Sequence, residues 1–309
     1  MLIMKNIEPL KKSVVPQASA TIHQRGLFNA RDGTSIYYEV QGEGRPLIFC
    51  YGLVCRKEHW HHQIDYFSRK YQVITFDYRG HQSSSKPSND THLTLDWCAR
   101  DIQDLMAHLK LTEAVCLGHS MGVPVLTHLA RFEPERIKAA VFVCGAVTNP
   151  FENMFYSNRL NRVYKAAAKL YDFAPGFMNL VWQKFTEHNR LNYFLTSRLG
   201  FNASKAEEKD VLLYMEGVHQ TPFSTFQSLM NDYTNFDGTK QLPHIQCPVL
   251  VIAGEDDYIT PVLLQQEIAK LIPKGELVEI PDGSHNAHMD FPERVNGTIN
   301  EFLQRVDFV

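Results

Sequence analysis

The sequence predicts an α/β protein with a mostly parallel sheet flanked by helices and an inserted helical cap. Two observations support this fold class. Short, nearly continuous apolar runs that end in Gly, Asp or another turn-forming residue are typical of strands buried on both faces. Helical patterns lie between several of these runs, as in parallel sheets covered by helices. The runs occupy residues 46–52, 72–80, 114–120, 139–147, 248–257 and 276–285.

The beginning of the chain precedes this alternation. Residues 1–20 show no clear period, and we expect a loose leader there. Two β-prone runs then flank the turn dipeptide Asp32-Gly33, which predicts an antiparallel hairpin. The clearest helix is expected within residues 93–111, where one apolar stripe contains Leu95, Cys98, Ile102, Leu105, Met106 and Leu109.

A different pattern runs from about residue 148 to residue 236. This segment contains no buried-strand run, is helical in period and is crowded with aromatic residues. We interpret residues 148–236 as a helical cap inserted between two parts of a core, residues 21–147 and 237–309. The aromatic side chains either line an apolar pocket or fill the interior of the cap, and the sequence leaves both uses open.

Length, composition and charge restrict the classes of function. The 309 residues are 44% hydrophobic, which is enough for one sizeable core. The net charge is only -3, so we expect a small-molecule partner, no nucleic acid and no membrane insertion. Glu8, Pro9 and two lysines interrupt the apolar start before a signal peptide or a spanning helix could form. We therefore expect a cytoplasmic protein, whose oligomeric state the sequence does not predict.

Ser120 stands between two glycines at the end of the third apolar run. The pattern Gly118-His119-Ser120-Met121-Gly122 fits a nucleophile elbow, a sharp turn from a strand into a helix that exposes the serine hydroxyl. Side chains at the two glycines would keep the strand and the helix too far apart. Because a buried-strand pattern precedes the motif and a helical pattern follows it, we interpret Ser120 as a nucleophile.

A serine nucleophile needs a base that accepts its proton and a carboxylate that orients the base. Both should lie beyond the ends of other strands, where the serine also lies. His285 stands in the loop between the last apolar run and the last helical pattern, and His288 is its nearest rival. Asp256 and Asp257 both stand just beyond a buried run, and both are candidates for the acid.

These features together resemble the α/β-hydrolase superfamily, in particular its capped esterase and lactonase-like branch. The similarity runs from about Gly26 to Leu303, and its motifs are "TFDYRGHQSSSKP", "GHSMG", "GEDDYITP" and "GSHNAHMDFPERVNGTINEFL". In the family's acid loop the carboxylate lies three residues after the glycine, which selects Asp257. An acidic residue and a proline follow the family's histidine, which selects His285. The resemblance thus implies the α/β-hydrolase fold and a Ser120, Asp257 and His285 triad.

The resemblance also implies an oxyanion hole made by two backbone amides. In the family, one is the amide after the nucleophile, here Met121, and the other belongs to the loop after an early strand, here Leu53. The chain departs from the family pattern at Tyr51, where histidine is usual, and at Gln82, where glycine is usual. Neither departure affects a triad position.

From these residues and this resemblance we expect a serine hydrolase that cleaves carboxylic esters of small to medium apolar substrates through an acyl-enzyme. Several other activities would keep the same triad: carbon-carbon bond hydrolysis, lactone or thioester hydrolysis, acyl transfer and cofactor-free peroxidation. Some members of the fold act as ligand receptors without turnover, and this alternative also stays open.

We expect no cofactor and no metal ion. The stretch "KEHWHHQID" offers His59, His61 and His62, but no acidic or cysteine residue stands near them at ligand spacing. Its position resembles the family's helix after the oxyanion loop, with Trp60 packed inward.

Overall fold

The predicted fold class is confirmed. The computed structural model describes residues 21–308, so the predicted leader at residues 1–20 lies outside the described part of the chain. Every predicted apolar run overlaps a strand, and the predicted hairpin forms the first two strands. The strands are β1 (Ile22–Asn29), β2 (Ser35–Gln41), β3 (Pro46–Cys50), β4 (Gln72–Phe76), β5 (Ala114–His119), β6 (Ile137–Val143), β7 (Val249–Gly254) and β8 (Gly275–Ile280).

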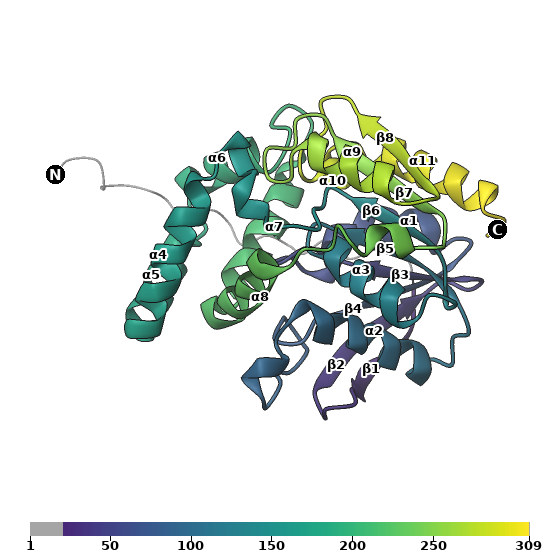
Figure 1. Ribbon diagram of the computed structural model, residues 1–309, viewed down its shortest axis with the longest axis horizontal. Helices are drawn as coiled ribbons and strands as arrows, with labels where there is room; N and C mark the ends of the chain where they lie inside the picture. The colour runs from purple at the N-terminus through teal and green to yellow at the C-terminus, as the bar shows by residue number, and fades with distance from the viewer. Residues whose placement is uncertain (1–20, 309) are drawn as a thin grey trace.

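The order of the strands brings the ends of β3 and β5 together. The eight-stranded sheet has the order β1-β2-β4-β3-β5-β6-β7-β8 (Figure 1). β3 to β8 pair in parallel, whereas β2 pairs antiparallel with both β1 and β4. The chain passes from β3 to β4 on one side and then to β5 on the other side of β3. In open α/β sheets, ligands bind in the crevice at such a change of direction.

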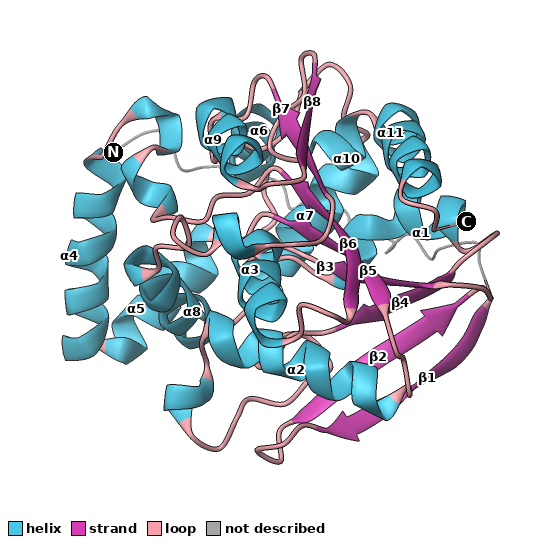
Figure 2. Ribbon diagram, turned by 45° about the vertical axis from the view of Figure 1, so that its right-hand side comes forward, coloured by secondary structure: helices cyan, strands magenta, loops and turns pink. Residues whose placement is uncertain are grey.

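Helices cover both faces of the sheet (Figure 2). One face carries α1 (His61–Phe67), the short α10 (Ala287–Asp290) and α11 (Pro292–Arg305). The other face carries α2 (Leu95–His108), α3 (Gly122–Phe132) and α9 (Val262–Leu271). Short 3-10 helices occupy Lys57–Trp60, Asp90–His92, Pro150–Glu152, Met154–Tyr156 and Leu242–His244.

The predicted helix within residues 93–111 is α2. It begins after Thr94, whose hydroxyl accepts a hydrogen bond from the amide of Trp97 at 3.3 Å, a common way to satisfy a free amide at a helix start. The predicted apolar stripe faces the core: Leu95, Cys98, Ile102, Leu105 and Met106 are fully buried, and Leu109 is partly buried.

The segment predicted as a cap holds five helices between β6 and β7. These are α4 (Arg159–Phe173), α5 (Pro175–Phe185), α6 (Arg190–Leu199), α7 (Glu208–Gln220) and α8 (Phe223–Asn235); Figure 1 shows α4 to α6 on the left and α7 and α8 nearer the centre. α8 contacts the rest of the chain through Tyr233, whose hydroxyl donates to the carbonyl of Ala146 at 2.7 Å. The division into core and cap stays a prediction, and we keep the name cap segment for residues 148–236.

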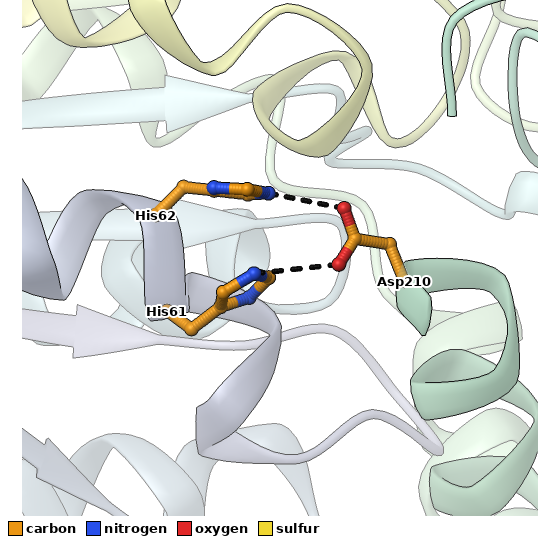
Figure 3. Close-up of side chains that lie close together, drawn as sticks. All are labelled: His61, His62 and Asp210. Carbon is orange, nitrogen blue, oxygen red and sulfur yellow. Dashed lines mark hydrogen bonds and ion pairs between the residues drawn. The ribbon is translucent and has the colours of Figure 1, made fainter. Parts of the chain in front are cut away.

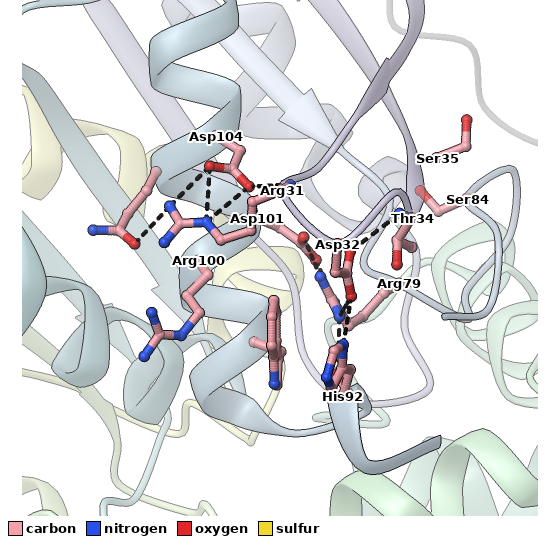
Figure 4. A network of polar contacts seen from close by, with 12 residues as sticks. Arg31, Asp32, Thr34, Ser35, Arg79, Ser84, His92, Arg100, Asp101 and Asp104 are labelled. Atoms are coloured by element: carbon pink, nitrogen blue, oxygen red, sulfur yellow. Dashed lines mark hydrogen bonds and ion pairs between the residues drawn. The ribbon is translucent and has the colours of Figure 1, made fainter. Parts of the chain in front are cut away.

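A buried arginine fixes the loop after β4. Arg79, in the motif "TFDYRGHQSSSKP", is fully buried, and its guanidinium donates to the carboxylate of Asp101 in α2 at 2.7 and 2.5 Å (Figure 4). It also donates to Asp32 in the hairpin turn at 3.0 Å. Because an unpaired buried charge is strongly destabilising, these two carboxylates hold the loop against α2 and the hairpin.

Two local features differ from the sequence prediction or from the family pattern. β8 is an edge strand, and only Ile280 in it is fully buried, so the prediction that this run is buried on both faces is wrong. Gln82 has a φ of 41°, a left-handed conformation that glycine adopts without strain.

Within residues 21–308, no helix combines the length and the apolar character that crossing a membrane requires.

Candidate active site

Ser120 occupies the sharp turn between β5 and α3. Its φ is 52°, a conformation that non-glycine residues rarely adopt and that recurs at functional sites. A Cβ at Gly118 would lie 2.8 Å from the carbonyl of Gly122, and a Cβ at Gly122 would lie 2.6 Å from the carbonyl oxygen of Cys50. Both distances are shorter than any real Cβ contact. The expectation that glycine is sterically required at both positions is confirmed.

The side chains of Ser120, His285 and Asp257 lie within hydrogen-bond distance of one another. Ser120 Oγ lies 3.1 Å from His285 Nε2, and His285 Nδ1 lies 3.1 Å from Asp257 Oδ2. The three residues follow β5, β8 and β7, and the two titratable ones are almost fully buried. A carboxylate beside Nδ1 keeps a proton on that nitrogen, which leaves Nε2 free to accept the proton of the serine hydroxyl.

The carboxylate of Asp257 is held by its own loop. Its Oδ1 accepts hydrogen bonds from the amides of Ile259 at 2.9 Å and Thr260 at 2.8 Å. The hydroxyl of Thr260 donates to Oδ2 at 2.8 Å. Sequence reasoning missed Thr260, although a threonine three residues after an aspartate is a familiar signal for this kind of local hydrogen bonding. The orientation of the carboxylate toward His285 therefore depends on these three donors and on a fourth, the side-chain amide of Gln265, which donates to Oδ2 at 3.4 Å.

The two rivals for triad positions lie elsewhere. Asp256 is exposed to solvent, and its amide donates to the carbonyl of Gly283 at 2.8 Å. His288 is fully buried with its ring against Trp60 and against His119, at 4.6 and 4.4 Å between ring centroids. Trp60 is itself fully buried, as expected from its position in the chain. The structure brings Asp257 and His285, not their rivals, to Ser120.

His119, the residue before the serine, contacts the loop that carries His285, residues 281–286, which we call the histidine loop. Its Nε2 lies 2.9 Å from the backbone carbonyl oxygen of His285. Burial lowers the pKa of His119 well below its usual value, and the nearby His285 lowers it further. The neutral imidazole therefore donates its Nε2 proton to that carbonyl. His119 thus supports the histidine loop through the backbone of His285.

The loop after β3 packs directly against the nucleophile elbow. A Cβ at Gly52 would lie 2.9 Å from the Cβ of Ser120, so the backbone of this loop approaches the serine closely. Among residues 21–308, neither the amide of Leu53 nor that of Met121 donates to a backbone carbonyl. Val54, the next residue, has a φ of 58°, a strained conformation for a β-branched side chain. Both predicted oxyanion donors thus belong to segments in contact with Ser120.

Tyr51, which departs from the family pattern, anchors this loop to its neighbour. Its side chain is fully buried, and its hydroxyl accepts a hydrogen bond from the amide of Tyr78 at 2.9 Å. The two rings pack edge to face with centroids 4.8 Å apart. Burial raises the pKa of Tyr51 well above its usual value, so the side chain stays neutral. Tyr51 therefore links the loops after β3 and β4.

A largely apolar cavity lies beside His285. Its volume is about 290 Å³. Most of its wall comes from α5, α6, α7 and the loops around them, and sequence reasoning could not select these residues. The lining residues are Val54, Phe185, Thr186, Asn192, Leu195, Thr196, Leu199, Gly200, Tyr214, Met215, Val218, Ile259 and His285.

The loop after α6 is hydrogen-bonded to the loop that carries His285. The carbonyl of Gly200 accepts from the hydroxyl of Ser284 at 2.9 Å and from the side-chain amide of Asn286 at 2.8 Å. The amide of Asn202 donates to the carboxylate of Asp290 at 3.1 Å, and the Ser284 hydroxyl, which has a single proton, contacts both this carboxylate and the carbonyl of Gly200. Residues on both sides of His285 are thereby tied to the cap segment.

Fold and site together define a protein of the α/β-hydrolase class. The model of the α/β-hydrolase fold family matches residues 45–292, and the chain belongs to this family.

Relatives of known activity cover almost the whole chain. The chain is 27% identical over 275 residues to (E)-2-((N-methylformamido)methylene)succinate hydrolase of Acinetobacter baylyi, covering 88% of this chain and 94% of that protein. It is 28% identical over 285 residues to a non-heme haloperoxidase of Rhodococcus erythropolis, covering 89% and 98%. A thermophilic esterase of Thermogutta terrifontis has the same fold, with a TM-score of 0.74, 23% identity and coverage of 92% and 99%.

Proposed function

We propose that this protein is a serine hydrolase that cleaves carboxylic esters of small to medium apolar substrates. The proposal depends on the chain of contacts from Ser120 Oγ through His285 to Asp257, with 3.1 Å at each step. Such a chain activates a serine hydroxyl for attack on a carbonyl carbon. The family supports hydrolysis as the class of reaction.

Each residue has a defined role in the proposed reaction. Ser120 attacks the ester carbonyl, and His285 Nε2 takes the serine proton and delivers it to the leaving alcohol. Asp257 orients His285 and stabilises the imidazolium that forms. The amides of Leu53 and Met121 donate to the negatively charged oxygen of the tetrahedral intermediate. Water, activated by His285, then releases the acid from Ser120 and restores the enzyme.

The cavity supports the proposed size and polarity of the substrate. Its volume of about 290 Å³ lies just below the range of about 300–1,000 Å³ that is common for ligand pockets. Leu195, Leu199, Met215 and Val218 contribute apolar surface to its wall. An apolar acyl or alcohol group of modest length fits this space better than a charged group, because a charge would lose its hydration there.

Hydrolysis of p-nitrophenyl esters, from acetate to palmitate, tests the proposal. We expect turnover by the wild type with an optimum at short or medium chains, and no turnover by Ser120→Ala. Turnover that persists in Ser120→Ala would contradict the assigned nucleophile. Absence of turnover on every ester would contradict ester hydrolysis and direct the same assay to carbon-carbon bond substrates. A single slow turnover that leaves a stable adduct would favour a ligand receptor.

A further inference from the structure

Two histidines and an aspartate from distant parts of the chain meet between α1 and α7. His61 and His62 begin α1, and Asp210 lies in the first turn of α7 in the cap segment (Figure 3). His62 Nε2 lies 3.0 Å from Asp210 Oδ2, and His61 Nε2 lies 3.3 Å from Asp210 Oδ1. The three ligand atoms lie within 4.8 Å of one another. The acidic partner that the sequence around the histidines lacks therefore comes from a helix of the cap segment.

Two atoms of this group are buried without a hydrogen-bond partner. His61 Nδ1 lies 3.1 Å from the carbonyl oxygen of Glu58, so Nδ1 carries the proton and the neutral ring has a lone pair on Nε2. That Nε2 and Asp210 Oδ1 make no hydrogen bond, although they lie 3.3 Å apart. Asp210 is fully buried. Two buried acceptors that face each other are unfavourable unless a proton, which would make an ion pair, or a metal ion lies between them.

We propose that His61, His62 and Asp210 bind a divalent transition-metal ion. Imidazole nitrogens with one carboxylate suit Zn²⁺ and its neighbours rather than Mg²⁺ or Ca²⁺, which prefer oxygen ligands. The hydrogen bond from His61 Nδ1 to a backbone carbonyl is the arrangement that orients metal-bound histidines. The side chain of His62 is 18% exposed, which gives an ion access from solvent and leaves room for water as a further ligand.

The ion would fix the helix that forms one wall of the active-site cavity. Downstream of Asp210, α7 contributes Tyr214 to the cavity lining, and the ring of Tyr214 stacks on His59 at 5.5 Å between centroids. A Cβ at Gly217 of α7 would lie 2.8 Å from the carbonyl oxygen of Val54, so α7 also packs closely on the loop after β3. Metal bound to α1 and α7 would thus clamp the cap segment onto the core, a structural role outside the proposed chemistry.

Calorimetric titration of chelator-treated protein with Zn²⁺ tests the site. We expect one high-affinity site per chain, with affinity reduced at least ~10-fold in His62→Gln and in Asp210→Asn, since loss of even an outer partner costs ~10–100-fold. His244→Gln, which changes an exposed histidine elsewhere, is the matched control and should bind Zn²⁺ like the wild type. Visible absorption of bound Co²⁺ gives a second readout that does not depend on turnover.

Thermal unfolding separates a metal site from a simple ion pair between His61 and Asp210. Zn²⁺ should raise the midpoint of unfolding in the wild type and in His244→Gln, but not in His62→Gln, because an ion that binds only the folded state stabilises it. His62→Gln keeps the buried aspartate and so provides the test even if Asp210→Asn does not fold. No stoichiometric binding to the wild type, or equal binding by His62→Gln, would overturn the proposal.

Discussion

Exchange of Asp257 for Asn should remove most of the turnover while the fold persists. The oxygen of the new amide should take the place of Oδ1, because the amides of Ile259 and Thr260 donate to that position at 2.9 and 2.8 Å. The NH₂ group must then stand at Oδ2, 3.1 Å from His285 Nδ1. Since an NH₂ group donates, Nδ1 must accept, and the proton of the neutral imidazole moves to Nε2. His285 then has no lone pair for the proton of Ser120.

The expected loss follows from this change of tautomer. A triad with its base in the wrong tautomer loses ~10⁴-fold in kcat, which corresponds to about 5 kcal/mol of transition-state free energy. Initial rates on the best p-nitrophenyl ester, with wild-type circular dichroism as the check on folding, measure this loss. Asp256→Asn is the matched control, because Asp256 is the exposed neighbour in the same loop, and it should turn over like the wild type. The assignment fails if Asp256→Asn loses turnover and Asp257→Asn keeps it.

Three further substitutions test the fold around the site. Gln82→Gly should raise the free energy of unfolding, measured by chemical denaturation, by up to ~1 kcal/mol. The substitution removes the strain of the left-handed conformation, and the greater backbone entropy of glycine in the unfolded chain offsets part of this gain. A lower free energy of unfolding would contradict the idea that Gln82 is strained. Tyr51→Phe should lower the same quantity by ~1–3 kcal/mol, since the buried amide of Tyr78 loses its acceptor, and a change below this range would contradict the anchoring role. Burial raises the pKa of Asp290 to about 6 from an ordinary 3.8, so its contribution to stability is fully present below pH 3.8 and is lost as the pH rises through 6. Unfolding measured across this range should show a pH-dependent difference of up to about 3 kcal/mol between wild type and Asp290→Asn, and parallel curves would contradict the raised pKa.

The central part of the sheet was predictable because strands β3 to β7 are buried. The strands between Pro46 and Gly254 lie under helices on both faces, and their sequences are therefore almost continuously apolar. β8 deviates, since it is an edge strand in which only Ile280 is fully buried and the other residues are half-buried or exposed. The apolar runs also mark where the strands end, so the sequence could place Ser120, His285 and Asp257 beyond strand ends. The choice of Asp257 over Asp256 needed the family motif.

What the sequence could not predict depends on contacts between distant segments. No local pattern indicates that Asp210 lies beside His61 and His62, because the helical period of α7 does not specify which part of the core it meets. The shape of the cavity depends in the same way on how the helices of the cap segment pack. The hydrogen bond from the Tyr78 amide to Tyr51 joins two loops whose separation in the sequence gives no hint of contact.

The hydrogen bonds of Gly200 and Asn202 to the histidine loop have a consequence for protein engineering. Within this family, new substrate ranges could be sought by transplanting a cap from one member to another. Here a transplant with junctions at residues 148 and 236 would break bonds to Ser284, Asn286 and Asp290, which hold His285 from both sides. Substrate choice and the placement of the base would then change together. The unit that can be exchanged is therefore larger than the cap segment and includes the histidine loop.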